Sequence, residues 1–237
     1  MAEKEKEKPE KSDKAAKQKA AGLEKAKAAK KAKEDALVVA TAEELKAPAP
    51  PARLYDKYKA EIVPALKEKF GLKNILAVPR LEKIVISMGL GKAVTSGEKG
   101  RLETAEKELA IISGQKPVRC KAKKSVANFK VREGQETGLK VTLRGTRMYG
   151  FSDRTITLAF PRVKDFRGVN PASFDTAGNY NSGFTEQSVF PEVNVADITH
   201  QQGMNITIVT TASNVEQGRE LLRAFGMPFS EASKQGK

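Results

Sequence analysis

Two short stretches in the middle of the chain alternate apolar and polar residues. Residues 127–132 read ANFKVR and residues 139–144 read LKVTLR, so every second side chain is apolar. A period of two is typical of a strand with one buried face. The stretch between them, 132–138 (REGQETG), carries glycine and predicts that the two strands form a β-hairpin. One face of this hairpin can cover a core, and the other carries cations that can meet a polyanion.

Apolar residues recur at helical spacing in four other segments. The expected helices are 53–70, 102–112, 145–160 and 214–225. Pro64 is expected to kink or divide the first of them. Gly71 and Gly114 follow the first two helices and are expected to end them. The third segment also fits a strand, and we favour a helix because Pro161 would end it there.

Two further alternating segments, around 84–88 and over 204–211, predict strands. The resulting order is helix, strand, helix, hairpin, helix, strand, helix. It predicts an α+β fold in which one antiparallel β-sheet has helices packed on one face, in a single compact domain. Residues 161–184 are rich in Gly, Asn and Ser and predict a long loop, a kind of segment that is often functional. Its aromatic residues could stack on bases or pin the loop to the core: Phe166, Phe174, Tyr180 and Phe184.

Composition divides the chain into three parts. Residues 1–51 are built mostly from Ala, Lys and Glu, with too few larger apolar residues for a core, and they predict a disordered, low-complexity N-terminal extension. Residues 52–229 form the expected folded domain, and residues 230–237 form a short polar tail. The first 50 residues hold 13 Lys and 10 Asp or Glu, a net charge of +3, so most of the total of +14 belongs to the folded domain.

A net charge of +14 indicates an acidic partner, either nucleic acid or an anionic membrane. No apolar run approaches the ~20 residues needed to span a bilayer, and the N-terminus has no apolar signal segment. The single cysteine, Cys120, excludes an intrachain disulfide and fits a reducing compartment such as the cytoplasm. We therefore expect a cytoplasmic protein with no membrane partner.

The charge is most concentrated between residues 116 and 132 (KPVRCKAKKSVANFKVR). This stretch contains no carboxylate and seven cations: Lys116, Arg119, Lys121, Lys123, Lys124, Lys130 and Arg132. Cations placed so closely repel one another, which favours a binding site for a polyanion. The alternative is an ordinary solvated surface.

No catalytic, metal or cofactor site is expected. The segment 89–100 (GLGKAVTSGEKG) has Val94 where a dinucleotide loop places its third glycine, and it lacks the GxxxxGK[ST] pattern. His200 is the only histidine, and Cys120 has no partner base in the sequence. An enzyme acting on a phosphorylated substrate is therefore disfavoured, and no small-molecule substrate is expected. A general nucleic-acid binder, such as a DNA-compacting or RNA-chaperone protein, stays open as an alternative.

Several ordered motifs resemble a known family. They are VPRLEKIVISMGLGKA, ISGQKPVRCKAKKSVANFKVREG, GLKVTLRGTRMYGF, PRVKDFRGV, FDTAGNYNSGFTEQSVFPE, MNITIVTTA and ELLRAFGMPF. In this order they resemble the bacterial-type ribosomal large-subunit protein five family, which binds 5S rRNA in the central protuberance. The resemblance covers about Leu54 to Phe229. The extension before Ala52, Thr146 where the family often has an acid, and Cys120 in the basic stretch are departures.

The resemblance implies a compact α+β domain with an antiparallel sheet. It also implies four partners: 5S rRNA, large-subunit rRNA, P-site tRNA and small-subunit protein thirteen. The loop from Phe166 to Phe184 would lie nearest the subunit interface. The residues expected to bind rRNA are Asn74, Arg80, Gln115, Lys116, Lys130, Arg132, Lys140, Arg144 and Arg147. The residues expected to contact tRNA are Arg119, Lys121, Lys123, Lys124 and Ser125.

Overall fold

The computed structural model describes residues 52–195 and 198–230. The predicted disorder of the 1–51 extension and the polar tail from residue 231 onward lie outside these ranges. Within them, none of the helices is long and apolar enough to cross a bilayer.

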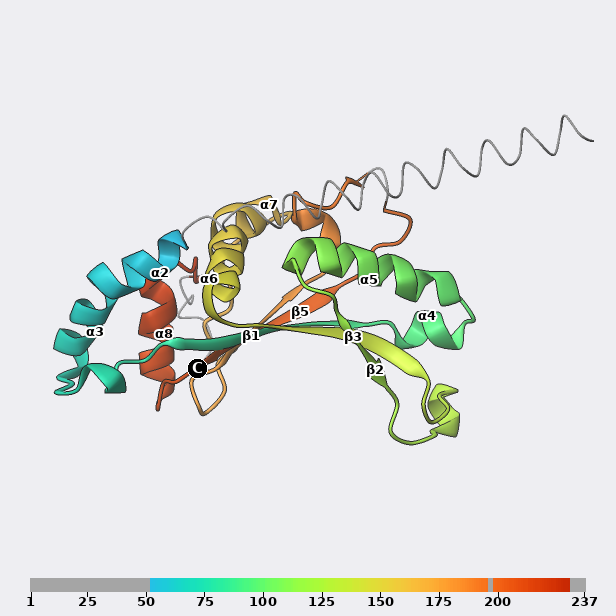
Figure 1. Cartoon of the computed structure of the whole chain (residues 1–237), viewed down its shortest axis with the longest axis horizontal. Helices are drawn as coiled ribbons and strands as arrows, with labels where there is room; N and C mark the ends of the chain where they lie inside the picture. Colours follow the sequence, from blue (N-terminus) through green and yellow to red (C-terminus); the bar gives the residue numbers. More distant parts are fainter. Residues whose placement is uncertain (1–51, 196–197, 231–237) are drawn as a thin grey trace, which may run out of the picture. The chain divides into compact units, whose positions relative to one another are not determined.

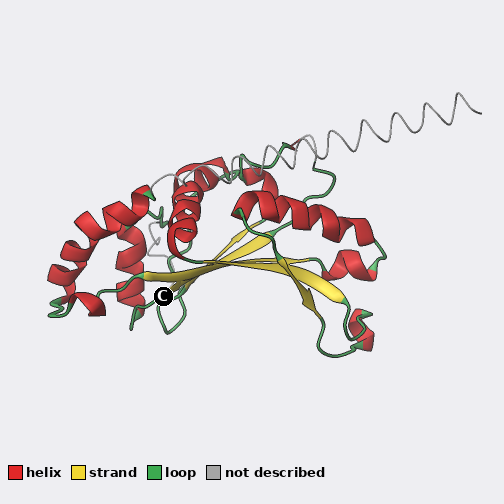
Figure 2. Cartoon of the chain, viewed as in Figure 1, coloured by secondary structure: helices red, strands yellow, loops and turns green. Residues whose placement is uncertain are grey.

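A five-stranded antiparallel sheet runs through the folded part, as Figure 2 shows in yellow. The strands are β1 (Leu81–Gly89), β2 (Val118–Lys121), β3 (Glu136–Leu143), β4 (Tyr180–Phe184) and β5 (Met204–Thr210). Their order in the sheet is β2-β3-β1-β5-β4, so β1 lies at the centre, and β2 and β4 form the edges. The sequence pattern predicted the strands at β1, β3 and β5, and it missed β2 and also β4, which lies within the predicted loop.

The helices gather on one face of the sheet and at one end of it. In Figure 1, α4, α5 and α6 lie above the sheet, while α2, α3 and α8 lie at its left end. Their bounds are α2 Arg53–Lys57, α3 Val63–Phe70, α4 Gly91–Thr95, α5 Lys99–Ser113, α6 Gly145–Arg154, α7 Phe160–Arg162 and α8 Val215–Ala224. Short 3₁₀ turns span Ile75–Ala77, Ala127–Phe129 and Gln187–Val189. The predicted α+β class with helices on one face is confirmed.

We call the helices above the sheet, α4, α5 and α6, the helical layer. The core lies between the helices and the sheet. Ile84, Ile86 and Met88 of β1 are each at most 1% exposed, as strict alternation along a half-buried strand requires. Leu109 of α5 and Leu221 of α8 are fully buried in the same core. Gly71 and Gly114 end their helices in the left-handed conformation, with φ of 60° and 66°, as predicted.

Both prolines that lie in helical segments follow a wider turn. Tyr58–Ile62 and Thr155–Ala159 are π-helical turns, in which Val63 and Phe160 donate their N–H to carbonyls five residues back. The wider turn accommodates the ring of the next residue, Pro64 or Pro161, which would clash with a carbonyl four residues back in a regular helix. The helix continues through Pro64 to Phe70, so Pro64 does not divide it, and the alternative expectation of a kink stays a prediction. The prediction that Pro161 ends its helix was wrong, because the helix continues through it to Arg162.

The hairpin is longer than predicted. Its first strand is β2, which pairs with β3, whereas residues 127–129 form a 3₁₀ turn in the connection between the two strands. The prediction that residues 127–132 form the first strand was therefore wrong. Phe129 is 74% exposed and does not cover the core. The apolar alternation misled because Val126 and Val131 pair with each other in a bridge across the tip, instead of lying on one strand.

The predicted long loop is fixed to the body at its second half. Asp175 accepts hydrogen bonds at Oδ1 from the N–H of Ala177 and of Asn179, at 3.1 and 2.7 Å, and at Oδ2 from the Asn179 side chain. These hydrogen bonds, led by the one from the Asn179 side chain, lower the pKa of the Asp175 carboxyl. Asn179 in turn accepts the N–H of Thr210 at its Oδ1. The loop thus closes onto β5 and delivers the edge strand β4.

Candidate nucleic-acid interface

One face of the sheet carries no helix and is lined by short polar side chains. Ser87 of β1 lies in register between Lys140 of β3 and Asn205 of β5, and Gly183 of β4 continues the row. The next row holds Thr142, Val85, Thr207 and Asn181. Every residue of these rows is exposed or half-buried, whereas their neighbours along the strands are buried or face the helices. We call these two rows the open sheet face.

The hairpin tip, residues 121–135, extends from one end of this face, at the lower right of Figure 1. It brings together the densest group of exposed cations from the sequence: Lys121, Lys123, Lys124, Lys130 and Arg132. The tip is held by its own hydrogen bonds. Ser125 Oγ accepts the N–H of Glu133 at 2.9 Å, and Gln135 Oε1 accepts the N–H of Arg132 at 3.0 Å. Its cations are thus displayed on an ordered loop, while the hydroxyl oxygen of Ser125 already supports that loop.

An apolar surface accompanies the cations of the tip. Phe129, 74% exposed, and Val126, 41% exposed, line a groove between the tip and α4. Lys92 of α4 lines the same groove. An exposed aromatic ring among lysines is a combination that can stack on an unpaired base while the cations contact phosphates. From the sequence pattern, Phe129 was expected in the core instead.

Asn74 and Arg80 lie at the start of β1, far from the tip along the sheet. Asn74 Oδ1 accepts the N–H of Leu76 at 2.9 Å and begins a 3₁₀ turn, so this side chain shapes the backbone. Leu76 is 86% exposed at that turn. The Arg80 backbone exchanges hydrogen bonds with Thr211, and Arg80 is exposed. Asn74, Leu76 and Arg80 therefore form a second exposed group of residues, at the end of the sheet opposite the hairpin tip.

The remaining predicted residues lie around the sheet. Gln115 and Lys116 connect α5 to β2, and the Gln115 N–H donates to Ser113 Oγ at 3.3 Å. Arg144 continues the alternation of β3 on the side of Lys140, because its backbone is still extended with φ −139° and ψ 161°. Arg147 is exposed in the first turn of α6, which belongs to the helical layer. Lys140 therefore belongs to the open sheet face and Arg144 follows on the same side of β3, whereas Arg147 does not.

Arg119 is the only one of these predicted cations with an ion pair in the described residues. It contacts Glu106 of α5 at 2.6 Å and Glu136 of β3 at 3.1 Å. These hydrogen bonds, first to Glu106 and then to Glu136, raise the pKa of its guanidinium. The prediction that Arg119 contacts tRNA stays a prediction, and the structure gives this side chain internal partners.

The loop aromatics pin the chain, as one of the two sequence interpretations expected. Tyr180 is 1% exposed, and its ring centroid lies 4.7 Å from that of Phe174 and 5.7 Å from that of Phe229. Phe184 and Phe166 both pack on Phe160, at 5.2 and 5.5 Å. Tyr180 and Phe184 are buried and cannot stack on bases, whereas Phe166 and Phe174 are half-buried.

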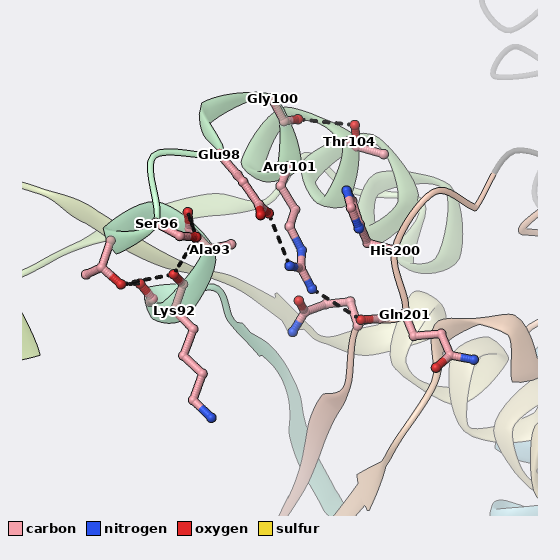
Figure 3. A network of polar contacts seen from close by, with 12 residues as sticks. Lys92, Ala93, Ser96, Glu98, Gly100, Arg101, Thr104, His200 and Gln201 are labelled. Atoms are coloured by element: carbon pink, nitrogen blue, oxygen red, sulfur yellow. Dashed lines mark hydrogen bonds and ion pairs between the residues drawn. The ribbon is translucent and has the colours of Figure 1, made fainter.

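A polar network fixes residues 198–203 to the helical layer (Figure 3). Arg101 of α5 donates to Glu98 Oε2 at 3.3 Å and to the Gln201 carbonyl at 3.4 Å. The buried Gln187 donates to the His200 carbonyl at 2.6 Å and to Glu108 Oε2 at 3.3 Å. Burial raises the pKa of Glu108, against the opposing effect of the Gln187 hydrogen bond. His200 is a loop residue, as predicted.

Among residues 52–195 and 198–230, no cluster of three or more His, Cys, Asp or Glu side chains could hold a metal ion. The site is instead built from short polar residues and cations. Four residues of the open face were not singled out from the sequence: Ser87, Asn181, Asn205 and Thr207. Ser87, Asn205 and Thr207 occupy polar positions of the alternating strands β1 and β5, which the sequence shows. The sequence does not show that they lie side by side, because that depends on the order of the strands in the sheet.

These features fit one class of protein, a basic nucleic-acid-binding protein. Two family models match the chain, one described as Ribosomal protein L5 over residues 74–132 and one described as the C-terminus of the same ribosomal family over residues 136–229. The large ribosomal subunit protein uL5 of Alkaliphilus metalliredigens is 57% identical over 180 residues, which cover 76% of this chain and 99% of that protein. The uL5 protein of Streptococcus thermophilus is 54% identical over 179 residues, covering 76% and 98%.

The chain belongs to the uL5 family of ribosomal proteins. It is a structural constituent of the large ribosomal subunit, and the family is one of structural proteins rather than enzymes. The family resemblance, the ribosomal location and the non-enzymatic class that the sequence motifs predicted are thereby confirmed.

Proposed function

We propose that this protein binds 5S rRNA and helps attach it to the large-subunit rRNA in the central protuberance. The observation that supports this most is the open sheet face, where Ser87, Lys140 and Asn205 lie side by side in a row that no helix covers. Cations lie beyond both ends of that face, at Arg80 and at the hairpin tip. The folded domain that does this is 52–229, and the 1–51 extension is an addition to it.

Each group would contribute in its own way. Lysine and arginine side chains neutralise phosphates and release condensed counterions, which supplies affinity with little sequence information. Asparagine, serine and threonine side chains of the open face can donate to and accept from 2′-hydroxyls and base edges, which report RNA shape and exposed loops. The proposed rRNA-binding residues are Asn74, Arg80, Gln115, Lys116, Lys130, Arg132, Lys140, Arg144 and Arg147.

Affinity for 5S rRNA should depend steeply on salt. With ~5 phosphates engaged, log K is expected to fall by roughly 3.5 to 4.5 for each tenfold rise in salt concentration. Filter binding or fluorescence anisotropy over a series of KCl concentrations measures this slope. A structured RNA of equal length serves as the control, and it should bind more weakly. A salt-independent affinity would contradict the proposal, and equal affinity for the control RNA would favour a general nucleic-acid binder.

We propose that the hairpin tip contacts P-site tRNA through Lys121, Lys123, Lys124 and Ser125. The tip extends away from the helical layer, and its cations are exposed on a loop that internal hydrogen bonds hold. A bridge to small-subunit protein thirteen through the loop between Phe166 and Phe184 is a further part of the proposal. It is supported by the motif resemblance and by the exposed residues in the first half of this loop.

Replacing Lys123 and Lys124 together by Glu is expected to weaken P-site tRNA binding of reconstituted ribosomes, while the melting temperature of the free protein stays nearly unchanged. Both side chains are exposed, so folding does not depend on them, whereas two reversed charges repel phosphates. The Lys123→Arg, Lys124→Arg variant keeps the charge and should behave like the parent. An equal loss of thermal stability and tRNA binding would indicate a structural role instead.

A further inference from the structure

Arg119 lies within the basic stretch, yet its side chain faces away from the open sheet face. Register places it opposite Leu139, which is 1% exposed, whereas the preceding residue, Val118, lies opposite Lys140. Successive side chains of a strand point to opposite faces. Lys140 therefore lies on the open side and Arg119 on the side of the helical layer.

On that side one guanidinium connects three elements. Arg119 itself belongs to β2. Its Nε and Nη2 donate to Glu106 Oε2 of α5 at 2.8 and 2.6 Å, and its Nη1 donates to Glu136 Oε2, at the start of β3, at 3.1 Å. The Glu106 side chain is only 15% exposed, so its carboxylate is held beneath the hairpin. Arg119 thus ties both strands of the hairpin to the helix that precedes them.

The place of this contact matters because it adjoins an irregularity in the pairing of β2 with β3. β2 is a four-residue edge strand, and its pairing with β3 shifts register between Cys120 and Lys121, next to Arg119. An irregularity of this kind bends a strand and disrupts the ladder locally. Backbone pairing resumes beyond it, where the Ala122 N–H donates to the Gln135 carbonyl at 2.8 Å, so the bend at the irregularity sets the direction of the hairpin.

We infer that Arg119 is a positioning residue, which fixes the hairpin against α5 and so sets the direction in which the tip cations reach RNA. Three of its donors are already used on carboxylates, which leaves little of the guanidinium for phosphate. A fixed hairpin also loses less conformational entropy on binding than a swinging one. The RNA part of this inference rests on the proposed function, whereas the fixation of the hairpin does not.

The fixation is tested without RNA. Spin labels are placed at Lys123→Cys in the tip and Glu103→Cys, an exposed site on α5, in a Cys120→Ser background. Electron–electron distance measurements should give one narrow distribution in this parent and a broadened or displaced one after Arg119→Ala or Glu106→Ala. Arg119→Lys, which keeps the charge but not the planar fork, should lie between them. An unchanged distribution in Arg119→Ala overturns the inference.

The RNA consequence separates positioning from direct contact. Arg119→Ala is expected to lower 5S rRNA affinity about threefold to tenfold, with the salt slope unchanged. A direct phosphate contact would instead reduce the slope by about 0.7 to 0.9. Melting temperatures are compared in parallel, so that a general loss of stability is distinguished from a redirected hairpin. If Arg119→Ala does not fold, the affinity and the salt slope are compared in Arg119→Lys and Glu106→Gln instead.

Glu106→Ala gives opposite signs for the two explanations. Removing a carboxylate raises the net charge by one and frees Arg119, so a direct contact predicts tighter RNA binding. Positioning predicts weaker binding. Glu103→Ala makes the same charge change on the same helix without touching Arg119, and it should not weaken binding. Tighter binding of Glu106→Ala than of Glu103→Ala overturns the inference. If the parent protein fails to bind 5S rRNA, the proposed function fails, while the distance measurement still decides the fixation.

Discussion

Replacing Lys140 by Glu is expected to lower the affinity for 5S rRNA roughly 30- to 150-fold, which corresponds to about 2–3 kcal/mol. Lys140 is the cation in the first row of the open sheet face, beside Ser87 and Asn205. The substitution removes one charge-assisted contact, which contributes ~1.5–3 kcal/mol, and places a carboxylate against phosphates. Anisotropy titrations of parent and variant at one fixed salt concentration measure the ratio.

Lys107→Glu is the matched control. It makes the same charge change at an exposed position of α5, on the helical layer. The net charge falls equally in both variants. A difference in their affinity for 5S rRNA therefore depends on the position of the charge on the open sheet face and not on the total charge. If both variants lose affinity equally, the open sheet face is not the binding surface, and long-range electrostatics explains the binding.

Gly218→Ala is expected to lower the free energy of unfolding by about 2–3 kcal/mol. A Cβ at Gly218 would lie 2.5 Å from the carbonyl oxygen of Gly178, a backbone atom that cannot rotate away. That carbonyl also accepts a hydrogen bond from Thr210 Oγ1 at 2.9 Å, so moving it disturbs the attachment of the loop to β5. For a domain of this size the melting temperature should fall by about 5–10 °C, and calorimetry or circular dichroism measures it.

Gly150→Ala tests whether the loss comes from the close approach and not from the substitution itself. Gly150 lies within α6 and has no atom within 4 Å of the position of a Cβ. Alanine there should stabilise the helix by about 0.5–1 kcal/mol, since glycine is the poorer helix former. Should Gly218→Ala behave like Gly150→Ala, then α8 and the 170–179 loop do not pack as tightly as the structure indicates.

Long periodic segments were predicted well from the sequence. Burial of one face of β1 or α5 demands a repeating apolar residue over several turns or alternations, and that repeat is visible in the chain. β4 was missed because YNSGF has no apolar alternation of its own. It becomes a strand because β5 offers it hydrogen-bonding partners, while the Asp175–Asn179 turn delivers it to that edge.

The basic stretch illustrates the converse case. Its exposed charges were predicted, but alternation over six residues, 127–132, was taken for a strand and proved to be a turn. Short windows carry little information, because a chance apolar spacing and a real one look alike. Phe129 was consequently predicted in the core, whereas the structure places it at the exposed tip. Arg119 was predicted as one of several equivalent cations, whereas the structure shows that it connects the hairpin to α5.

The sequence by itself determined the class of fold, the helical caps, the central strands and the family, because each is written in local periodicity or in ordered motifs. Only the tertiary structure decided which polar residues share a face and which cations are already paired. Ser87, Lys140 and Asn205 are far apart in the chain and meet only through the order and register of β3, β1 and β5. The physical reason is that sheet pairing is non-local: hydrogen bonds between distant strands set the neighbours of each side chain, and the residues adjacent in sequence do not.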